Sequence, residues 1–174
     1  MKMDVAIIWD DGDDGSFEET IIAPWQRAGT TDQHMAATLE LRGQGDVNDR
    51  FAEQDAEGLY AWLCGYGAIA EAVTPADWPV EAVEMGHMET IIAPQAGVLI
   101  FEKELGDLVE EGQRFARILR RPGDPASEVV LYTEQTGRLV TRYRDRLIPQ
   151  GMGVAKFTGS RLSRNWCGGL LDPN

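Results

Sequence analysis

Two stretches of the 174-residue sequence decide the fold of its second half. Residues 93–100 read APQAGVLI and residues 133–140 read TEQTGRLV, with glutamine, glycine and leucine at matching places. A second match follows, because residues 108–112 (LVEEG) align with residues 147–151 (LIPQG). Each copy has the pattern of a glycine turn, a strand, a second turn and another strand. A unit of this size must bury its apolar face against its copy. We therefore predict an internal repeat, with units at about 91–118 and 131–157.

Short strands separated by glycine and proline are typical of a compact sandwich or barrel. We expect residues 76–174 to form an all-β domain that resembles the barrel-sandwich hybrid of biotinyl and lipoyl carriers. A carrier needs a lysine at the tip of the hairpin that joins its two halves. The corresponding connection, residues 120–128 (RRPGDPASE), contains no lysine, and Lys103 and Lys156 lie elsewhere in the repeat units. The pattern indicates a similar fold without the carrier function.

The first 75 residues have a different character, with 15 acids and 4 bases against 14 acids and 12 bases in residues 76–174. Two prolines within residues 74–79 mark a linker between the halves. We therefore place the domains at 1–75 and 76–174.

Strand and helix patterns alternate in this first half. Residues 5–9 read as a buried strand, and residues 16–19 fit a capping box that starts a helix ending before Pro24. Residues 36–41 read as a second buried strand. Residues 51–65 read as a helix that Gly65 or Gly67 ends. Its apolar face comprises Ala52, Ala56, Leu59, Tyr60 and Leu63.

Charge and composition exclude several classes of protein. The formal net charge of −13 would repel phosphate backbones, which argues against nucleic acid as a partner. No run approaches the roughly 18 apolar residues of a membrane span, and the N-terminus turns acidic too early for a signal peptide. Cys64 and Cys167 lie far apart without a CxxC motif, and Cys64 fits a helix core. We expect a cytoplasmic protein with reduced thiols and no membrane partner.

Glu40 carries the most chemical information in the sequence. It interrupts the apolar run of residues 36–41, and an ionised carboxylate is costly to bury unless it is paired. Arg42, two residues further on the same face of a strand, is one pairing partner. An edge strand would instead leave Glu40 in water. A third interpretation is a general acid or base at the end of a strand.

Several short motifs, read in order, resemble the succinylglutamate desuccinylase/aspartoacylase family of zinc-dependent deacylases. The Thr-x-Glu-x-x-Gly strand that contains Glu40, followed by the helix with Asp55 and Ala56, is the most specific of them. The β repeat and the tail also match the pattern of the family. The resemblance covers nearly the whole chain, with matching pieces at residues 16–19, 24–25, 36–43, 46–47, 55–56, 65–69, 93–97, 106–107, 112 and 169–173.

The resemblance implies a fold and a chemistry. Residues 1–75 would be the α/β remnant of a carboxypeptidase-like zinc-hydrolase domain, and residues 76–174 its β domain. In that family, a zinc-bound water attacks the acyl carbonyl of an N-acyl amino acid or a similar small-molecule substrate. A glutamate on a strand is the general acid and base, and by motif position this residue is Glu40. Arg42 is a candidate for binding a substrate carboxylate.

The sequence departs from the family at the residues that bind the metal. Family members bind Zn²⁺ through a His-x-x-Glu pair and a later histidine, whereas His34 is followed by Ala37 and His87 by Thr90. We therefore expect no metal ligands in this chain, which reads as the C-terminal part of a deacylase. An excised piece, a truncated gene and one chain of a split enzyme all fit. The partners expected are a missing N-terminal zinc-binding half or a second copy. The alternative is a non-catalytic interaction or assembly module built on the β domain.

Overall fold

The computed structural model describes residues 5–8, 17–41, 43, 45, 47–73 and 81–164. The chain divides into two compact units. The first comprises residues 1–4 and 10–80, and the second comprises residues 5–9 and 81–174. The predicted capping box at residues 16–19, the linker at 74–79 and Cys167 fall wholly or partly outside the described residues. None of the helices in the described ranges is long and apolar enough to cross a bilayer.

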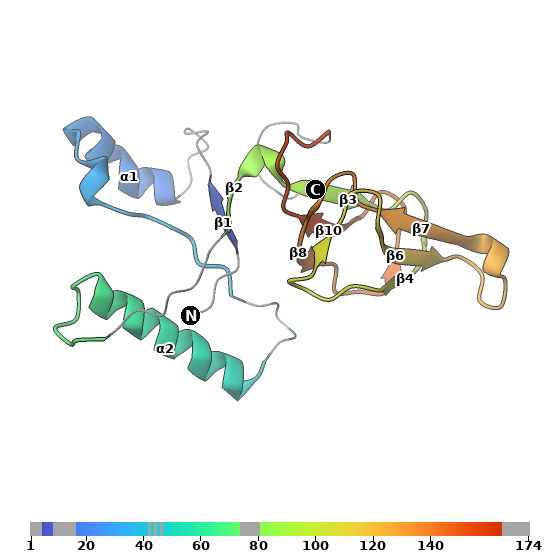
Figure 1. Ribbon diagram of the computed structural model, residues 1–174, viewed down its shortest axis with the longest axis horizontal. Coiled ribbons are helices and arrows are strands. Elements are labelled where there is room, and N and C mark those ends of the chain that lie inside the picture. Colours follow the sequence, from blue (N-terminus) through green and yellow to red (C-terminus); the bar gives the residue numbers. More distant parts are fainter. Residues whose placement is uncertain are drawn as a thin grey trace. The chain divides into compact units, whose positions relative to one another are not determined.

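Helix α1 (Phe17–Ala28) opens the first unit and is followed by the short helix η1 (Thr31–Gln33) (Figure 1). The end of α1 is set by Gly29, whose φ of 68° is a left-handed conformation that glycine adopts without strain. The amide of Thr30 donates to the carbonyl of Trp25 (3.0 Å), and the amide of Gly29 donates to that of Gln26 (3.1 Å). These two bonds form a Schellman motif, which satisfies the last carbonyls of the helix.

The prediction that this helix ends before Pro24 is wrong, because Pro24 lies inside α1. A proline in a helix interior removes its own N–H donor and costs about 3 kcal/mol, but it does not prevent the following residues from continuing the helix. The stop signal is the glycine five residues later.

Helix α2 (Asp49–Gly65) confirms the predicted second helix. Asn48 caps its start, with the side-chain oxygen accepting from the amide of Arg50 at 3.0 Å. Gly67, with φ of 83°, closes a second Schellman motif, in which Ala68 donates to the carbonyl of Leu63 (3.0 Å).

The predicted apolar face of α2 is not buried within its unit. Of its members, Leu59 is 37% exposed and Tyr60 is 44% exposed, whereas the buried positions are Gly58 and Cys64. Cys64 is a free, buried cysteine, as predicted. Helical spacing places residues on one face, but burial needs a partner element against that face.

The predicted strand at residues 36–41 is also absent. These residues are irregular, and the described part of the first unit contains α1, η1 and α2 but no strand. A strand is stabilised by hydrogen bonds to a neighbouring strand, so an apolar run without such a neighbour does not form one.

The second unit is built from short strands (Figure 1). Strand β1 (Val5–Ile8) confirms the predicted first strand, and it pairs in parallel with β2 (Glu81–Glu84). It is not buried as predicted, since Ile7 is 38% and Ile8 44% exposed. The eight remaining strands are β3 (Glu89–Ile92), β4 (Gly97–Phe101), β5 (Leu108–Val109), β6 (Arg114–Leu119), β7 (Glu128–Tyr132), β8 (Gly137–Arg142), β9 (Leu147–Ile148) and β10 (Gly153–Phe157). Helix η2 (Met85–His87) precedes β3, and η3 (Pro125–Ser127) precedes β7.

These eight strands form two four-stranded sheets, in the orders β3-β10-β8-β5 and β7-β6-β4-β9. The two orders are equivalent, because strands that are four apart in the chain occupy the same place in the two sheets. These pairs of equivalent strands are β3 and β7, β4 and β8, β5 and β9, and β6 and β10. Each sheet therefore takes two strands from each half of the unit. The repeated glycines occupy equivalent places in this arrangement, with Gly97 and Gly137 starting β4 and β8.

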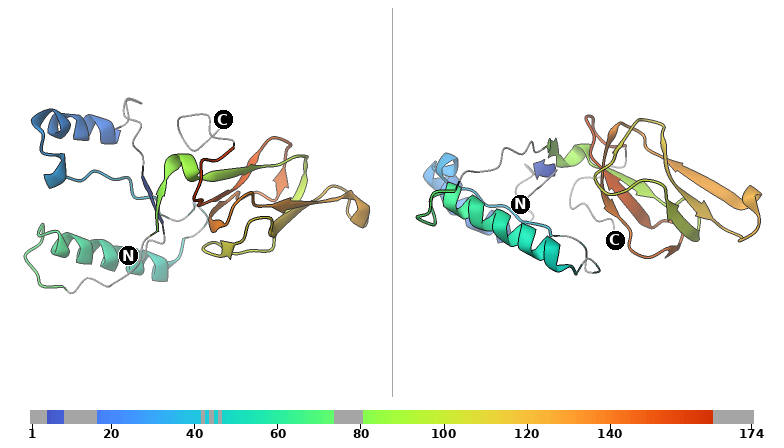
Figure 2. Two further views of the ribbon diagram at one scale, coloured as in Figure 1. Left: turned by 45° about the horizontal axis from the view of Figure 1, so that its top comes forward. Right: turned by 60° about the horizontal axis from the view of Figure 1, so that its bottom comes forward.

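The core of the second unit lies between the two curved sheets (Figure 2). Phe115 and Phe157 are fully buried and meet edge to face, with ring centroids 4.8 Å apart and planes at 73°. Aromatic pairs favour this geometry because the positive edge of one ring faces the negative face of the other. Around them pack the other buried residues, which include Leu99, Val109, Ile118, Leu139, Ile148 and Val154.

Candidate functional site

Glu40, the predicted general acid or base, lies in the irregular segment after η1 with its side chain exposed. Arg42, its predicted neighbour, falls outside the described residues. The assignment of these two residues to catalysis and substrate binding therefore stays a prediction. The two residues are related only by their positions in the sequence, because no sheet in the described part of the unit contains this segment.

The residues that the structure describes do not form a zinc centre. No group of three His, Cys, Asp or Glu side chains that could hold a metal ion occurs among the described residues. Each histidine has a different environment. The ring of His34 stacks on Trp25, with centroids 4.4 Å apart and planes at 16°, while His87 lies in η2 and its carbonyl accepts from Gln135. A zinc site needs three protein ligands and an open position.

One tyrosine on α2 has a strongly perturbed proton affinity. The hydroxyl of Tyr60 donates to the carboxylate of Glu71, in the segment that follows the helix. This hydrogen bond, reinforced by the negative charge of Glu71, raises the pKa of Tyr60 to about 12. The phenol is thus held in its protonated form, in which it donates a hydrogen bond.

The structure reveals a buried acid that sequence reasoning missed. Glu89, at the start of β3, is only 3% exposed. Its Oε1 atom accepts a hydrogen bond from the amide of Glu134 at 2.8 Å, whereas its Oε2 atom is buried without a partner. Burial raises the pKa of Glu89, and the backbone amides of Glu134 and Gln135 oppose that rise only in part.

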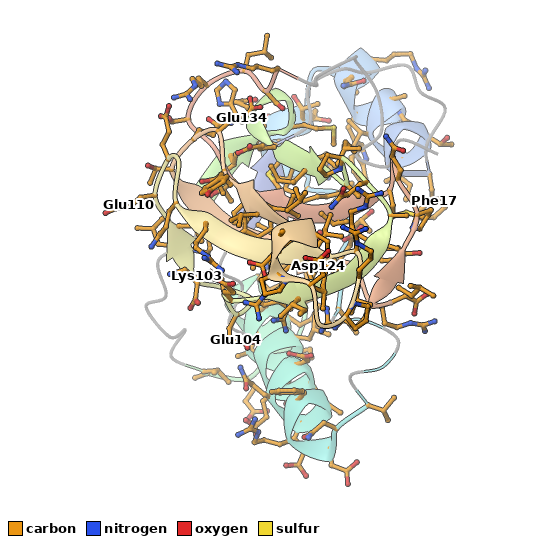
Figure 3. The ribbon with its side chains drawn as sticks, turned by 90° about the vertical axis from the view of Figure 1, so that its right-hand side faces the viewer. Phe17, Lys103, Glu104, Glu110, Asp124 and Glu134 are labelled. Atoms are coloured by element: carbon orange, nitrogen blue, oxygen red, sulfur yellow. The ribbon has the colours of Figure 1, made fainter. Side chains whose placement is uncertain are left out.

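Gln135 ties three segments together beside this carboxyl. Its Nε2 atom donates to the carbonyl of His87 (3.3 Å), and its Oε1 atom accepts from the amides of Ser160 (3.1 Å) and Arg161 (3.2 Å). A methyl group on Gly159 would overlap the Gln135 side chain, so only glycine permits this approach. We call residues 158–164 the C-terminal strap. The strap crosses the turn between β7 and β8, where Glu134 is labelled in Figure 3.

Arginines hold the strap at its middle and at its end. Arg161 pairs with Glu111 at 3.0 Å and also donates to the carbonyl of Glu134, while Arg164 approaches the Glu134 carboxylate at 3.4 Å. Within the strap, the amide of Ser163 donates to the carbonyl of Gly86 at 2.8 Å. A cavity of about 10 Å³ lies here, lined by Glu89, Glu134, Gln135, Arg161, Leu162, Ser163 and Arg164.

A wider hollow of about 340 Å³ lies between the free edges of the two sheets. Strand β3 forms one wall and β7 the other, and both are the outermost strands of their sheets. Among the residues that line this hollow, Ile92 (36% exposed) and Tyr132 (52% exposed) are the large apolar residues with exposed side chains. Open strand edges of this kind accept a further strand.

The hairpin that would carry a prosthetic group in a carrier connects β6 and β7. Asp124 lies at its tip, whereas Lys103 lies in the turn after β4 (Figure 3). Arg121 and Asp124 form an ion pair across the tip at 2.6 Å. The lysine needed for attachment is therefore not on this hairpin.

A signal for Glu89 was present in the sequence but weak. The repeat places Gln95 and Gln135 at the same position of its two units, which marks that turn as structurally important. Nothing in the spacing distinguishes Glu89 from the other acids, because its burial depends on the strap, which lies more than sixty residues further along the chain.

No family model matches this sequence, and no curated protein matches it either. Solved structures do. A succinylglutamate desuccinylase/aspartoacylase from Shewanella frigidimarina NCIMB 400 has a TM-score of 0.74 at 22% identity, covering 88% of this chain and 44% of its own. A succinylglutamate desuccinylase/aspartoacylase family protein from Shewanella amazonensis SB2B has a TM-score of 0.75 at 23% identity, covering 87% and 45%. The ectoine utilization protein EutE (DoeB) from Ruegeria pomeroyi has a TM-score of 0.68 at 20% identity, covering 91% and 48%.

The chain therefore has a mixed α/β fold with curved sheets that these hydrolase structures share. The structures that it matches include proteins of the succinylglutamate desuccinylase/aspartoacylase family, so the resemblance predicted from the sequence motifs is confirmed at the level of the fold. The chain spans less than half the length of the structures it matches, which agrees with a C-terminal part of that fold.

Proposed function

We propose that this chain is the C-terminal portion of a zinc-dependent deacylase that hydrolyses the acyl-amide bond of N-acyl amino acids or similar small substrates. The observation that carries the proposal is the fold likeness, which extends over 87–91% of the chain in three solved structures. The motif around Glu40 adds independent support from the sequence.

Residues 1–75 are then the remnant of the carboxypeptidase-like catalytic domain, and residues 76–174 are the β domain. The matching strand orders of the two four-stranded sheets support a barrel-sandwich hybrid with an internal repeat for the second of these. Strand β1 is the exception to this division, since it pairs with β2 of the second unit.

Glu40 holds the catalytic proton in this proposal. Its exposed carboxylate can accept a proton from the attacking water and return it to the departing amine. Arg42, two residues later, would bind a carboxylate of the substrate through its two parallel N–H groups. Zn²⁺ belongs to the complete enzyme, with ligands outside this chain.

The two-stranded sheet of β1 and β2 supports a further element of the proposal, namely a partner. Parallel strands are normally covered on both faces and rarely occur as an isolated pair. Here Ile7 and Ile8 are more than a third exposed, although both are strand residues with apolar side chains. The partner is the N-terminal zinc-binding half of the fold, and the alternative partner is a second copy of this chain.

Complementation tests the proposal directly. The chain is mixed with a zinc-loaded N-terminal half of a related deacylase and assayed on a panel of N-acyl amino acids. Turnover should require both parts, and Glu40→Gln should abolish it. Glu57→Gln, an exposed glutamate on α2, is the matched control and should retain activity. Full activity in the Glu40→Gln variant would show that the general acid or base lies elsewhere.

A non-catalytic interaction module is the second candidate, favoured by the lack of a three-ligand metal cluster among the described residues. The same mixing experiment separates the two. A stable complex without turnover on any substrate of the panel would support the module, whereas turnover dependent on Glu40 would exclude it.

A further inference from the structure

The two carboxyl oxygens of Glu89 have unequal environments. Oε1 accepts the amide of Glu134 at 2.8 Å, and Oε2 has no partner although its residue is 97% buried. An unsatisfied buried polar atom costs about 1–3 kcal/mol, and an unpaired buried charge costs more. Native proteins resolve such an atom by protonation, by a bound water or by both.

The space beside Glu89 fits one water molecule. The small cavity measures about 10 Å³, which is close to the smallest volume that holds a single water. Its lining is polar, since Gln135 and Ser163 contribute to it together with Glu89. A water in such a place needs two to four polar partners, and these residues can supply them.

The charges around Glu89 do not neutralise it. Arg161 attracts the carboxylate, but its guanidinium is already bound by Glu111 at 3.0 Å. Glu134 repels it, and Arg164, which lines the same cavity, approaches Glu134 at 3.4 Å. Across the sheet, the residue opposite Glu89 on β10 is Phe157, which offers no polar group.

We propose that Glu89 and the adjacent cavity form a binding site for one proton and one water molecule, in which the neutral carboxyl donates from Oε2 to the water in that cavity. Oε1 keeps its bond from the Glu134 amide in this state. Because the cavity is lined by Arg161, Leu162 and Ser163, the site lies beneath the C-terminal strap. Loss of the proton leaves a charged Glu89 carboxylate at the cavity and weakens the contacts that hold the strap against it. This inference does not depend on the proposed deacylase activity.

The direction of the pH effect follows from the raised pKa of Glu89. The folded chain holds the proton more tightly than the unfolded chain, whose glutamate titrates near its ordinary value of 4.5. The stabilisation is therefore complete below 4.5 and is lost as pH rises through the folded-state pKa. Amides of the strap should exchange faster with solvent water over the same range, beyond the intrinsic effect of pH.

Two measurements on the full chain test the site. Carboxyl carbon NMR of the parent chain should give Glu89 a titration midpoint above 4.5, and a high-resolution crystal structure at acid pH should show one ordered water within hydrogen-bond distance of Oε2. A midpoint at or below 4.5 would overturn the proton assignment. A dry cavity, or a protein donor bound to Oε2, would overturn the water assignment.

Matched variants distinguish this site from a merely structural glutamate. Glu89→Gln keeps the Oε1 acceptor but cannot ionise, so hydrogen exchange of residues 158–163 should become independent of pH once the intrinsic rate is removed. Glu110→Gln, at an exposed position, should leave the pH profile of the parent intact. The same pH profile in Glu89→Gln as in the parent would contradict the proposal. If that variant fails to fold, the two measurements on the parent chain still decide the matter.

Discussion

The α-carbon of Gly137 lies against the main chain of Thr158 so closely that a methyl group on it would overlap the carbonyl oxygen of Thr158. Two hydrogen bonds fix this approach. The amide of Arg138 donates to the Thr158 hydroxyl at 2.8 Å, and the amide of Thr158 donates to the Arg138 carbonyl at 2.9 Å. The glycine is needed here for its lack of a side chain, because its φ is not in the left-handed region.

Gly137→Ala should therefore destabilise the second unit by about 3 kcal/mol, the upper part of the range for overpacking, since backbone must move. Gly97→Ala, at the equivalent place, should cost less. Its methyl would meet Ile118 Cγ2 at 2.6 Å and the Leu119 carbonyl oxygen at 2.8 Å, both longer than the corresponding distance to the Thr158 carbonyl oxygen at Gly137. Urea denaturation of both variants measures the difference, with Gly45→Ala as a control because open space surrounds that glycine. Equal costs at Gly137 and Gly45 would refute the steric argument.

Truncation of the core aromatic pair should be severe. Phe157→Ala removes the ring that packs edge-on to Phe115 and should cost about 3–5 kcal/mol, a large part of the stability of a small domain. Phe157→Leu fills more of the space and should therefore lose less stability than Phe157→Ala. It can still be measured if the alanine variant is unfolded. Leu147→Ala, at a position 78% exposed, should change the free energy of unfolding by less than about 0.5 kcal/mol. Thermal unfolding followed by circular dichroism gives all three values.

An ion network between the turn after β4 and strands β6 and β7 should make the stability of the second unit sensitive to acid. Arg114 donates to both carboxylate oxygens of Glu102, and Arg117 donates to one of them at 2.5 Å while also approaching Glu128 at 3.3 Å. The hydrogen bonds from Arg114, with a smaller contribution from Arg117, lower the pKa of Glu102 below its ordinary 4.5. The stabilisation is present above 4.5 and is lost as pH falls through the lowered value.

Glu102→Gln should accordingly lower Tm slightly near neutral pH and flatten the decline of Tm below pH 4.5. The effect should shrink in high salt, because these charges are partly exposed and therefore screened. Glu110→Gln is the control, since its exposed side chain is outside the network. A parent-like acid profile in Glu102→Gln would show that the network contributes nothing measurable.

The tyrosine on α2 offers a spectroscopic prediction. In an alkaline titration of the absorbance of tyrosinate, the difference between the parent and Tyr60→Phe should have its midpoint at about 12. Glu71→Gln should move that midpoint toward 10.0, because it removes the negative charge that accepts the phenolic proton. A midpoint that does not move in Glu71→Gln would mean that the hydrogen bond is absent in solution.

The β unit could be predicted from the sequence because its signals are local. The glycines at 97, 112, 137 and 151 mark turns or starts of strands, and the nearly constant spacing between the repeated stretches indicates an internal repeat. Helix α2 was predictable for the same reason, since Asn48 caps it and Gly67 ends it. These features depend on residues within a few positions of one another.

The predictions that failed concern features that depend on partners distant in sequence. Residues 36–41 have the composition of a strand, but a strand forms only against another strand. Leu59 and Tyr60 lie on one helix face, but no element of the described part of their unit buries it. Glu89 is buried by a strap that only the three-dimensional structure places beside it. The sequence points to Glu40 as the candidate acid or base, and that role stays a prediction.

The exchange of strands between the halves has a consequence for the order of folding. Among the described strands, β10 is the only hydrogen-bonded neighbour of β3 and also joins it to β8, so without β10 this sheet separates into a lone strand and the pair β8-β5. Neither repeat unit can complete a sheet by itself, and the pairing of β3 with β10 closes a loop of some sixty residues. A nascent chain therefore cannot complete these two sheets until β10 has left the ribosome, and before that point its apolar strands need protection from aggregation.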